Sequence, residues 1–233
     1  MREHEERCFR AKLERFERRH ELTLETFNLV TEPPAAQSVW SEYEVILVGG
    51  SGKYGCVGNT RPWFAQFLQT LREIVAADRA MFCSCFGHQA LAAALGGRVI
   101  VDRENAELGT HGIRLNEKGL VDPLYAGLET EFTAQLGHND RVVELPQQAV
   151  NLAFTEACPI QAYRLGDALI YATQFHPELD HLENQERAMG YLQVYDVEMT
   201  RPEKLAQMFR PSEAASELIA RFFRLVWAAR VSV

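Results

Sequence analysis

The 233-residue sequence predicts an α/β domain with a mixed sheet, and three observations support this prediction. Apolar strand patterns alternate with helical patterns over residues 43–97, as in sheets built from strand–helix units. Over residues 97–175 short strand patterns follow one another with only turn residues between them. The remainder of the chain, from residue 183, has helical patterns.

The first predicted element is an amphipathic helix over residues 1–20. Charged side chains cover most of it, and its apolar face is formed by Cys8, Phe9, Leu13 and Phe16. A short strand is expected at residues 27–30, followed by a turn or linker at residues 32–37.

Two strand–helix units follow in the first half of the chain. Residues 43–50 are predicted to form a buried strand that runs into glycines, and Pro62 begins a helical pattern that ends near Ala77. Residues 80–85 form the next buried strand, and the helix after it ends at the glycines of residues 96–97.

The second half is rich in strands and ends in helices. The strand candidates are residues 97–102, 111–115, 132–136, 141–145, 149–155, 160–165 and 168–175. Helical segments are expected at residues 183–195, from Pro202, and from Pro211 to about Ala229. The last of these has one strongly apolar side. We expect that side to pack on the sheet, with a dimer or partner surface as the alternative.

Composition excludes several classes of protein. The net charge of −8 argues against a general nucleic-acid binder or a protein that binds anionic membranes. No apolar run approaches the ~18 residues that a membrane span needs, and the charged N-terminus does not resemble a signal peptide. The five cysteines have no framework spacing, which indicates reduced thiols and a cytoplasmic protein.

Cys85 stands at the turn between a buried strand and a helix, where a side chain projects above the carboxyl end of a sheet. The free N–H groups at a helix N-terminus lower a thiol pKa, so this position favours a nucleophile. The alternative is a buried strand cysteine. That alternative suits Cys83 better, because Cys83 lies inside the strand with no turn beside it.

A thiol nucleophile needs a base, and the candidate is His176 at the end of an apolar strand. Glu178 follows two residues later across a proline, so its carboxylate can fold back onto one imidazole nitrogen. A purely structural histidine is the alternative. The turn at residues 48–55 is rich in glycine but lacks both phosphate-binding spacings. It is either a tight turn or a set of backbone donors for an oxyanion.

Together these stretches resemble a known family. CFGHQALAAALGG, QFHPEL and the VGGSG turn, with GHNDRVVELP and ACPIQAYRLG between the cysteine and the histidine, are similar to class I glutamine amidotransferases, most densely to the GMP-synthase-like ones. The resemblance runs from about Tyr43 to Leu179. It implies a three-layer flavodoxin-like fold with a mostly parallel mixed central sheet. It also implies one domain over residues 1–233, with a helical C-terminal extension from about residue 181.

The resemblance assigns roles to individual residues. Cys85 matches the family's nucleophile, His176 its general base and acid, and Glu178 the carboxylate that orients the histidine. The substrate-binding positions that it implies are the backbone N–H groups of Gly50 and Phe86, the side chain of Gln89, and the backbone at Gly137 and His138.

The implied activity is hydrolysis of the glutamine side-chain amide through a cysteinyl thioester, with no metal or organic cofactor. The implied small-molecule partner is glutamine, without nucleic acid or membrane. Either a separate synthetase subunit accepts the ammonia or the protein acts alone, and a homodimer is a further option. The alternatives are a hydrolase of γ-glutamyl peptides or amines, and a non-catalytic relative that binds a partner through its C-terminal helix.

The chain departs from the family pattern at two points. Cys83 stands where the family usually has glycine, and a helix stands at the start of the chain, where the family usually begins with a central strand.

Overall fold

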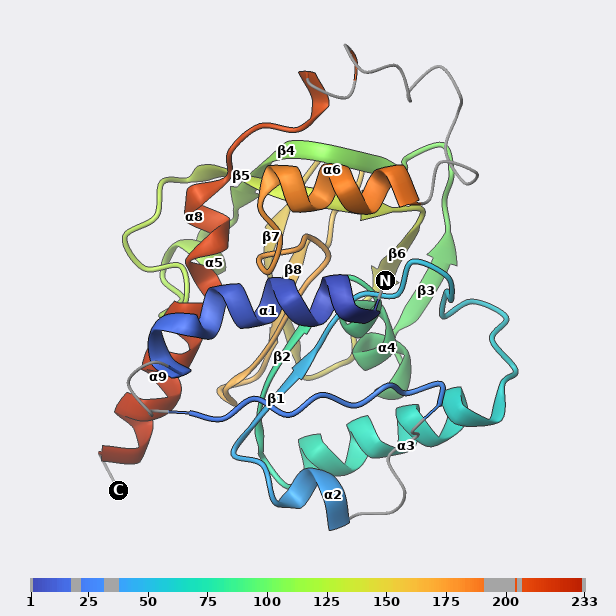
Figure 1. The fold of residues 1–233 in the computed structure, drawn as a ribbon, viewed down its shortest axis with the longest axis vertical. Coiled ribbons are helices and arrows are strands. Elements are labelled where there is room, and N and C mark those ends of the chain that lie inside the picture. The colour runs from blue at the N-terminus through green and yellow to red at the C-terminus, as the bar shows by residue number, and fades with distance from the viewer. Residues whose placement is uncertain (1, 18–21, 32–37, 191–203, 205–206, 232–233) are drawn as a thin grey trace.

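The computed structural model describes residues 2–17, 22–31, 38–190, 204 and 207–231 (Figure 1). The helices are α1 (Arg2–Glu17), α2 (Ser38–Ser41), α3 (Pro62–Ala76), α4 (Phe86–Ala94), α5 (Glu117–Leu120), α6 (His181–Gly190), α8 (Glu213–Ser216) and α9 (Leu218–Val231). The strands are β1 (Val45–Val48), β2 (Ala80–Ser84), β3 (Arg98–Val101), β4 (Glu107–Leu115), β5 (Glu131–His138), β6 (Asp140–Glu144), β7 (Ala149–Phe154), β8 (Ala162–Leu165) and β9 (Ile170–Thr173).

A seven-stranded sheet with the order β1-β2-β9-β8-β7-β4-β5 organises the described residues, and β3 and β6 form a separate two-stranded sheet. The mixed sheet is confirmed, but the expectation that it is mostly parallel is wrong. Only β1, β2 and β9 run parallel to one another, and every other neighbouring pair is antiparallel. The helix α3 provides the crossover between β1 and β2, whereas strands joined by short connections pair antiparallel.

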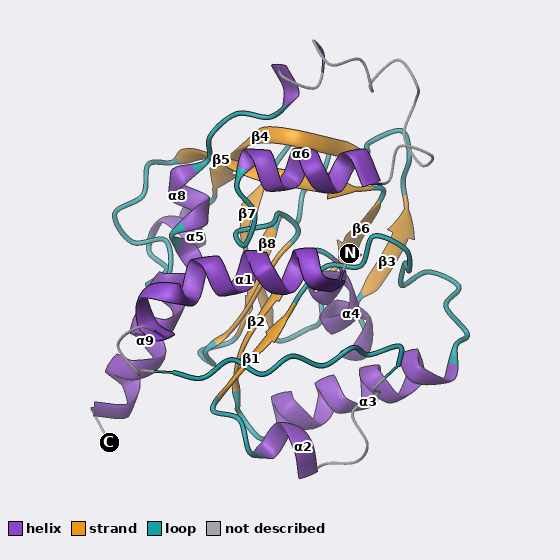
Figure 2. Cartoon of the chain, in the orientation of Figure 1, coloured by secondary structure: helices purple, strands orange, loops and turns teal. Residues whose placement is uncertain are grey.

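Helices cover both faces of the sheet and give three layers (Figure 2). Alternate residues of β2 point to opposite faces, so Met81 packs with α3 and α4 while Phe82 packs with α1 and α9. Phe222 of α9 sits edge-on against Phe82, with a centroid distance of 5.5 Å. The predicted packing of the C-terminal helix on the sheet is therefore confirmed. Its large apolar side chains are part of the core: Leu218, Ile219, Phe222, Phe223 and Val226.

The N-terminal helix is confirmed over the residues that the structure describes. Its four predicted apolar side chains are all buried: Cys8, Phe9, Leu13 and Phe16. The strand expected at residues 27–30 is wrong. Residues 22–27 have no regular structure and a turn follows, in which the Asn28 side chain accepts the Val30 N–H at 3.0 Å. A local bond of this kind competes with strand pairing.

Some expected features lie outside the described residues: the end of the first helix, the linker at residues 32–37, residues 191–195 and the start of the segment at Pro202. The other predicted strands and the helices from Pro62 and after Cys85 are present close to the expected bounds. In the part of the chain with assigned structure, no helix combines the length and apolar character that a bilayer span requires.

Candidate active site

Cys85 occupies a strained elbow between β2 and α4. Its backbone has φ 49° and ψ −101°, a conformation that costs a residue with a side chain of the order of 1–3 kcal/mol. Two hydrogen bonds hold the elbow: the Cys85 N–H donates to the Thr173 carbonyl at 2.8 Å, and the Cys85 carbonyl accepts the Gln89 N–H at 3.1 Å. Strain maintained in this way fits a residue whose side chain must project from the sheet edge.

Gly87 is required for close packing and not for the turn itself. The positive φ belongs to Cys85, whereas Gly87 lies within α4. A Cβ at Gly87 would lie 2.6 Å from the Val48 carbonyl oxygen, so only glycine lets α4 approach β1 this closely.

The His176–Glu178 pair is fully buried just beyond β9. Ser84 of β2 pairs with Thr173 of β9 in parallel register, so the elbow and this pair leave the sheet at the same edge. The His176 N–H donates to the Gln135 carbonyl at 2.8 Å, and the ring Nδ1 donates to Glu178 Oε1 at 2.6 Å. The carboxylate therefore assigns the proton to Nδ1, so that Nε2 carries the lone pair of the ring; in this structure Arg187 lies within hydrogen-bond distance of it.

The thiol and the imidazole are not hydrogen-bonded to each other among the described contacts. Cys85 Sγ lies 4.0 Å from the Gly137 carbonyl and 3.7 Å from Gln174 Nε2, which donates to it. The imidazole instead contacts Arg187 of α6, whose Nη1 lies 3.0 Å from Nδ1 and 3.2 Å from Nε2. The guanidinium therefore lies against the edge of the imidazole at Cε1, the carbon between the two ring nitrogens.

Burial dominates the electrostatics of this site. It raises the pKa of the Cys85 thiol to about 12, although the Arg187 charge acts in the opposite direction. Burial together with Arg187 lowers the pKa of His176 to about 4, against the effect of Glu178. Burial acts to raise the pKa of Glu178, yet His176 and Arg187 hold it below its usual value. At neutral pH the thiol and the imidazole are therefore both uncharged in this conformation.

The glycine-rich turn after β1 approaches the same residues. A Cβ at Gly50 would lie 2.7 Å from Arg187 Nη2 and 2.9 Å from His176 Cε1, so no side chain fits there. The Gly50 N–H donates to the carboxylate of Glu5, which comes from α1. The phenyl ring of Phe86 is buried against α3, and the backbone at Phe86 hydrogen-bonds the Cys85 sulfur.

The side chains of Gln89 and His138 are both hydrogen-bonded within the protein. Gln89 Nε2 donates to the Asp140 carbonyl at 2.9 Å and to Gln174 Oε1 at 3.1 Å. His138 Nδ1 lies 3.0 Å from the same carbonyl, and its Nε2 lies 3.0 Å from Glu107 Oε2. Their role in binding substrate stays a prediction. In this structure Gln89 bonds Gln174, which in turn donates to the Cys85 sulfur.

Glu107, His138 and Cys158 place candidate metal-ligand atoms within 4.8 Å of one another. The carboxylate of Glu107 is already hydrogen-bonded: it accepts from Thr155 at 2.9 Å and from Gln161 at 2.6 Å in addition to its contact with His138. The pKa of Glu107 is held below its usual value by His138, although burial opposes this. The Glu107 carboxylate is therefore already bonded on both oxygens within a buried hydrogen-bond network.

A family model described as "Glutamine amidotransferase class-I" matches residues 10–190, which is most of the chain and includes every site residue described above except Glu5. The chain belongs to the class I glutamine amidotransferase family.

Curated relatives of this amidotransferase match it over a shorter region. A subunit of the glutamine-hydrolyzing GMP synthase of Methanococcus vannielii is 37% identical over 102 residues, which cover 44% of this chain and 52% of the relative. The corresponding GMP synthase subunit of Pyrococcus abyssi is 38% identical over 102 residues, with the same coverage. The chain thus matches only about half the length of these relatives.

Solved structures support the fold over nearly the whole chain. A glutamine amidotransferase from Thermotoga maritima superposes with a TM-score of 0.76 at 18% identity, covering 92% of this chain and 90% of that one. A glutamine amidotransferase from Methylobacillus flagellatus gives a TM-score of 0.72 at 21% identity, covering 91% and 88%.

Three residues near the thiol and the imidazole of the amidotransferase were not predicted from the sequence: Glu5, Gln174 and Arg187. Gln174 precedes His176 by two residues in QFHPEL, so its position in that stretch was a usable signal. Glu5 and Arg187 offer no signal, because each is one charged residue among many on a helix rich in charge.

We expect Gln174→Met to raise the pKa of Cys85 and to lower the rate of turnover by roughly tenfold, because the amide hydrogen bond to sulfur favours the thiolate. Methionine keeps a long unbranched side chain and removes the donor to sulfur together with the acceptor of the Gln89 bond, while Gln89 keeps its bond to the Asp140 carbonyl. The measurement is the pH dependence of Cys85 alkylation, with kcat/KM alongside. The exposed Gln147→Met is the matched control, and equal alkylation profiles for the two variants would contradict the role.

Proposed function

We propose that this amidotransferase hydrolyses the side-chain amide of glutamine through a thioester on Cys85 and releases the ammonia to an acceptor. The observation that carries the proposal is the strained elbow of Cys85, which leaves the sheet at the same edge as the buried His176–Glu178 pair. The family match supports it, since it spans these residues.

In the proposed reaction, His176 Nε2 takes the proton of the Cys85 thiol as sulfur attacks the amide carbon. The carbonyl oxygen becomes an oxyanion, for which the backbone N–H groups of Gly50 and Phe86 are the proposed donors. His176 then gives the proton to the departing nitrogen, and ammonia leaves. Water, deprotonated by the same nitrogen, attacks the thioester and releases glutamate. Glu178 keeps the imidazole oriented and stabilises its charged form.

For the acceptor, we propose a separate synthetase subunit. The curated relatives from Methanococcus vannielii and Pyrococcus abyssi are themselves named as one subunit of a GMP synthase, which supports a division of the two half-reactions between chains. We further propose that residues 1–233 act as one amidotransferase domain with a helical extension from about residue 181. In this domain α8 and α9 contribute to the core.

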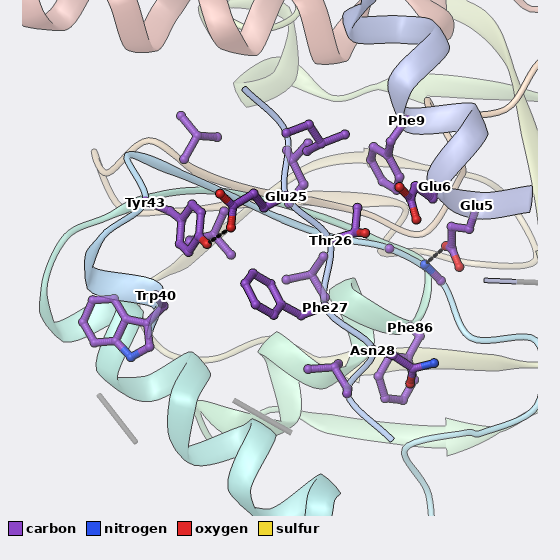
Figure 3. A pocket seen from close by; sticks show the side chains of 18 of the residues that line it. Glu5, Glu6, Phe9, Glu25, Thr26, Phe27, Asn28, Trp40, Tyr43 and Phe86 are labelled. Carbon is purple, nitrogen blue, oxygen red and sulfur yellow. Dashed lines mark hydrogen bonds between the residues drawn. The ribbon is translucent and has the colours of Figure 1, made fainter. Parts of the chain in front are cut away.

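A second substrate class has one observation in its favour. A cavity of about 740 Å³ extends from Gly50 between β1, α3 and residues 22–30 (Figure 3). Gly50, Phe86 and Arg187 line it but Cys85 and His176 do not, so it would receive a leaving group larger than ammonia only once the thiol opened towards it. A hydrolase of γ-glutamyl peptides or amines would use the same thiol, base and carboxylate.

The deciding experiment compares glutamine with a panel of γ-glutamyl peptides and γ-glutamyl amines, with glutamate release as the common signal. We expect glutamine to have the highest kcat/KM, and addition of a synthetase subunit to increase it. A γ-glutamyl peptide with a higher kcat/KM than glutamine would favour the second class. No release from any of these substrates, with or without a synthetase subunit, would contradict both.

A further inference from the structure

The first turns of α1 lie directly on the glycine-rich turn of the site. The carboxylate of Glu5 accepts the hydrogen bond of the Gly50 N–H (Figure 3). A Cβ at the neighbouring Gly49 would lie 2.5 Å from the same Glu5 oxygen, so helix and turn are in close contact. The N-terminal helix therefore contributes a side chain to a site otherwise built from the sheet edge, α4 and α6.

The Glu5 carboxyl is bonded to a backbone donor and lies near a buried cation. Burial raises the pKa of Glu5 to about 7, while the Arg187 guanidinium, buried beside Gly50 and His176, acts in the opposite direction. A backbone N–H with a buried guanidinium beside it forms an arrangement that can receive a carboxylate or an oxyanion. In this structure the Glu5 carboxyl group of the same chain occupies it.

The occupied donor is one that the proposed reaction requires. If the Gly50 N–H stabilises the oxyanion, it cannot at the same time be bonded to Glu5. The Glu5 side chain also carries the same γ-carboxylate group as glutamate, the product of the proposed reaction. Cys85 is only 6% exposed and His176 is fully buried, and neither lines the cavity that reaches Gly50.

We infer that the start of α1, up to Arg7, is an intramolecular plug in which Glu5 occupies the oxyanion position as a product-like group and must withdraw before substrate binds. The inference rests on the proposed function, because it takes Gly50 as an oxyanion donor. The plug describes the protein without substrate, in which the groups of the site are all in place but Glu5 occupies the Gly50 N–H.

The way α1 is anchored permits such a movement. Its later turns are held in the core, where Phe16 packs against Phe223 and Trp227 of α9 at centroid distances of 6.1 and 5.0 Å. Outside the site, the first turns contact Glu186 of α6. Arg7 pairs with it at 2.8 Å between two side chains that are each more than half exposed, and His4, which is mostly buried, lies 3.6 Å from the same carboxylate. Exposed pairs contribute little, so the start of the helix can lift while the rest stays packed.

The test measures how fast iodoacetamide alkylates Cys85, read by peptide mass spectrometry, in the wild type and in Glu5→Ala. We expect at least a roughly tenfold faster reaction in Glu5→Ala, because the side chain that occupies the Gly50 N–H and closes the site is removed. The matched control is Glu3→Ala, the same change at an exposed position of the same helix. Equal rates in the wild type and Glu5→Ala would overturn the inference.

Two further measurements distinguish opening of the plug from unfolding of the variant. Cys56, Cys83 and Cys158 are also buried, so unfolding of a variant would expose them together with Cys85. If Glu5→Ala proves unfolded by this criterion, Glu186→Gln decides instead. It removes the charge that holds Arg7 and His4 at the start of α1, and we expect a roughly two- to fivefold faster alkylation of Cys85. An unchanged rate in that variant would then overturn the inference.

Alkylation needs no substrate, so failure of the plug and failure of the proposed function give different results. Faster alkylation in Glu5→Ala without glutamine hydrolysis in any variant would uphold the plug and reject glutamine as the substrate. Glutamine hydrolysis with the same KM and the same alkylation rate in the wild type and Glu5→Ala would uphold the function and reject the plug.

Discussion

Cys85→Ala is expected to reduce glutamine hydrolysis by at least about 10⁴-fold, because it removes the atom that forms the thioester. The elbow should persist, since alanine is smaller and the backbone bonds from Cys85 to Thr173 and Gln89 involve no side-chain atom. The measurement is ammonia and glutamate release by the purified protein, with binding of glutamine followed separately by calorimetry.

The matched control for that loss is Cys83→Ala. Cys83 is fully buried in β2, packed among the apolar residues between the sheet and α3 and α4. We expect this variant to lose some stability from the small cavity and to keep its turnover within a few-fold of the wild type. If Cys83→Ala lost activity as completely as Cys85→Ala, the assignment of the nucleophile would have to be withdrawn.

His176→Ala is expected to lower kcat by about 10³- to 10⁴-fold, since it removes both the base for the thiol and the acid for ammonia. Glu178→Gln should cost less, about 10- to 100-fold. The amide oxygen can still accept the Nδ1 proton, and its nitrogen would take the place of Glu178 Oε2, which has no hydrogen-bond partner among the described residues. What disappears is the negative charge that stabilises the imidazolium.

The comparison of these two variants is made by steady-state kinetics at saturating glutamine, with His181→Ala as a histidine control on α6. Equal losses in His176→Ala and Glu178→Gln would argue against an orienting role for the carboxylate. Equal activity in His176→Ala and the control would remove His176 from the mechanism.

Local patterns in the sequence were strong enough to locate the elements that carry the chemistry. A buried strand that ends at Cys85, followed at once by a helix, is visible because apolar β-rich runs and alanine-rich runs differ in length and composition. The strand ending before His176 is visible for the same reason. Sheet direction was less accessible: β8 and β7 turned out antiparallel to their neighbours, because pairing depends on connections and on contacts far apart in sequence.

The contact between α1 and the site illustrates what local patterns miss. The apolar face of α1 was predicted correctly, and it packs in the core as expected. The same register turns Glu5 toward Gly50, 45 residues later in the chain, and nothing in the sequence near either residue indicates that they meet. Arg187 reaches His176 through the placement of α6 against β5, which is likewise a property of the folded chain.

By itself, the sequence determined the order of strands and helices and the identity of the candidate nucleophile, base and carboxylate, because each depends on residues close together in the chain. Only the tertiary structure decided the state in which these groups are found. There Arg187 lies against the imidazole, the thiol is uncharged, and Glu5 holds the Gly50 N–H. Burial and charge at a site are sums over all the elements packed around it, and such sums exist only once the chain is folded.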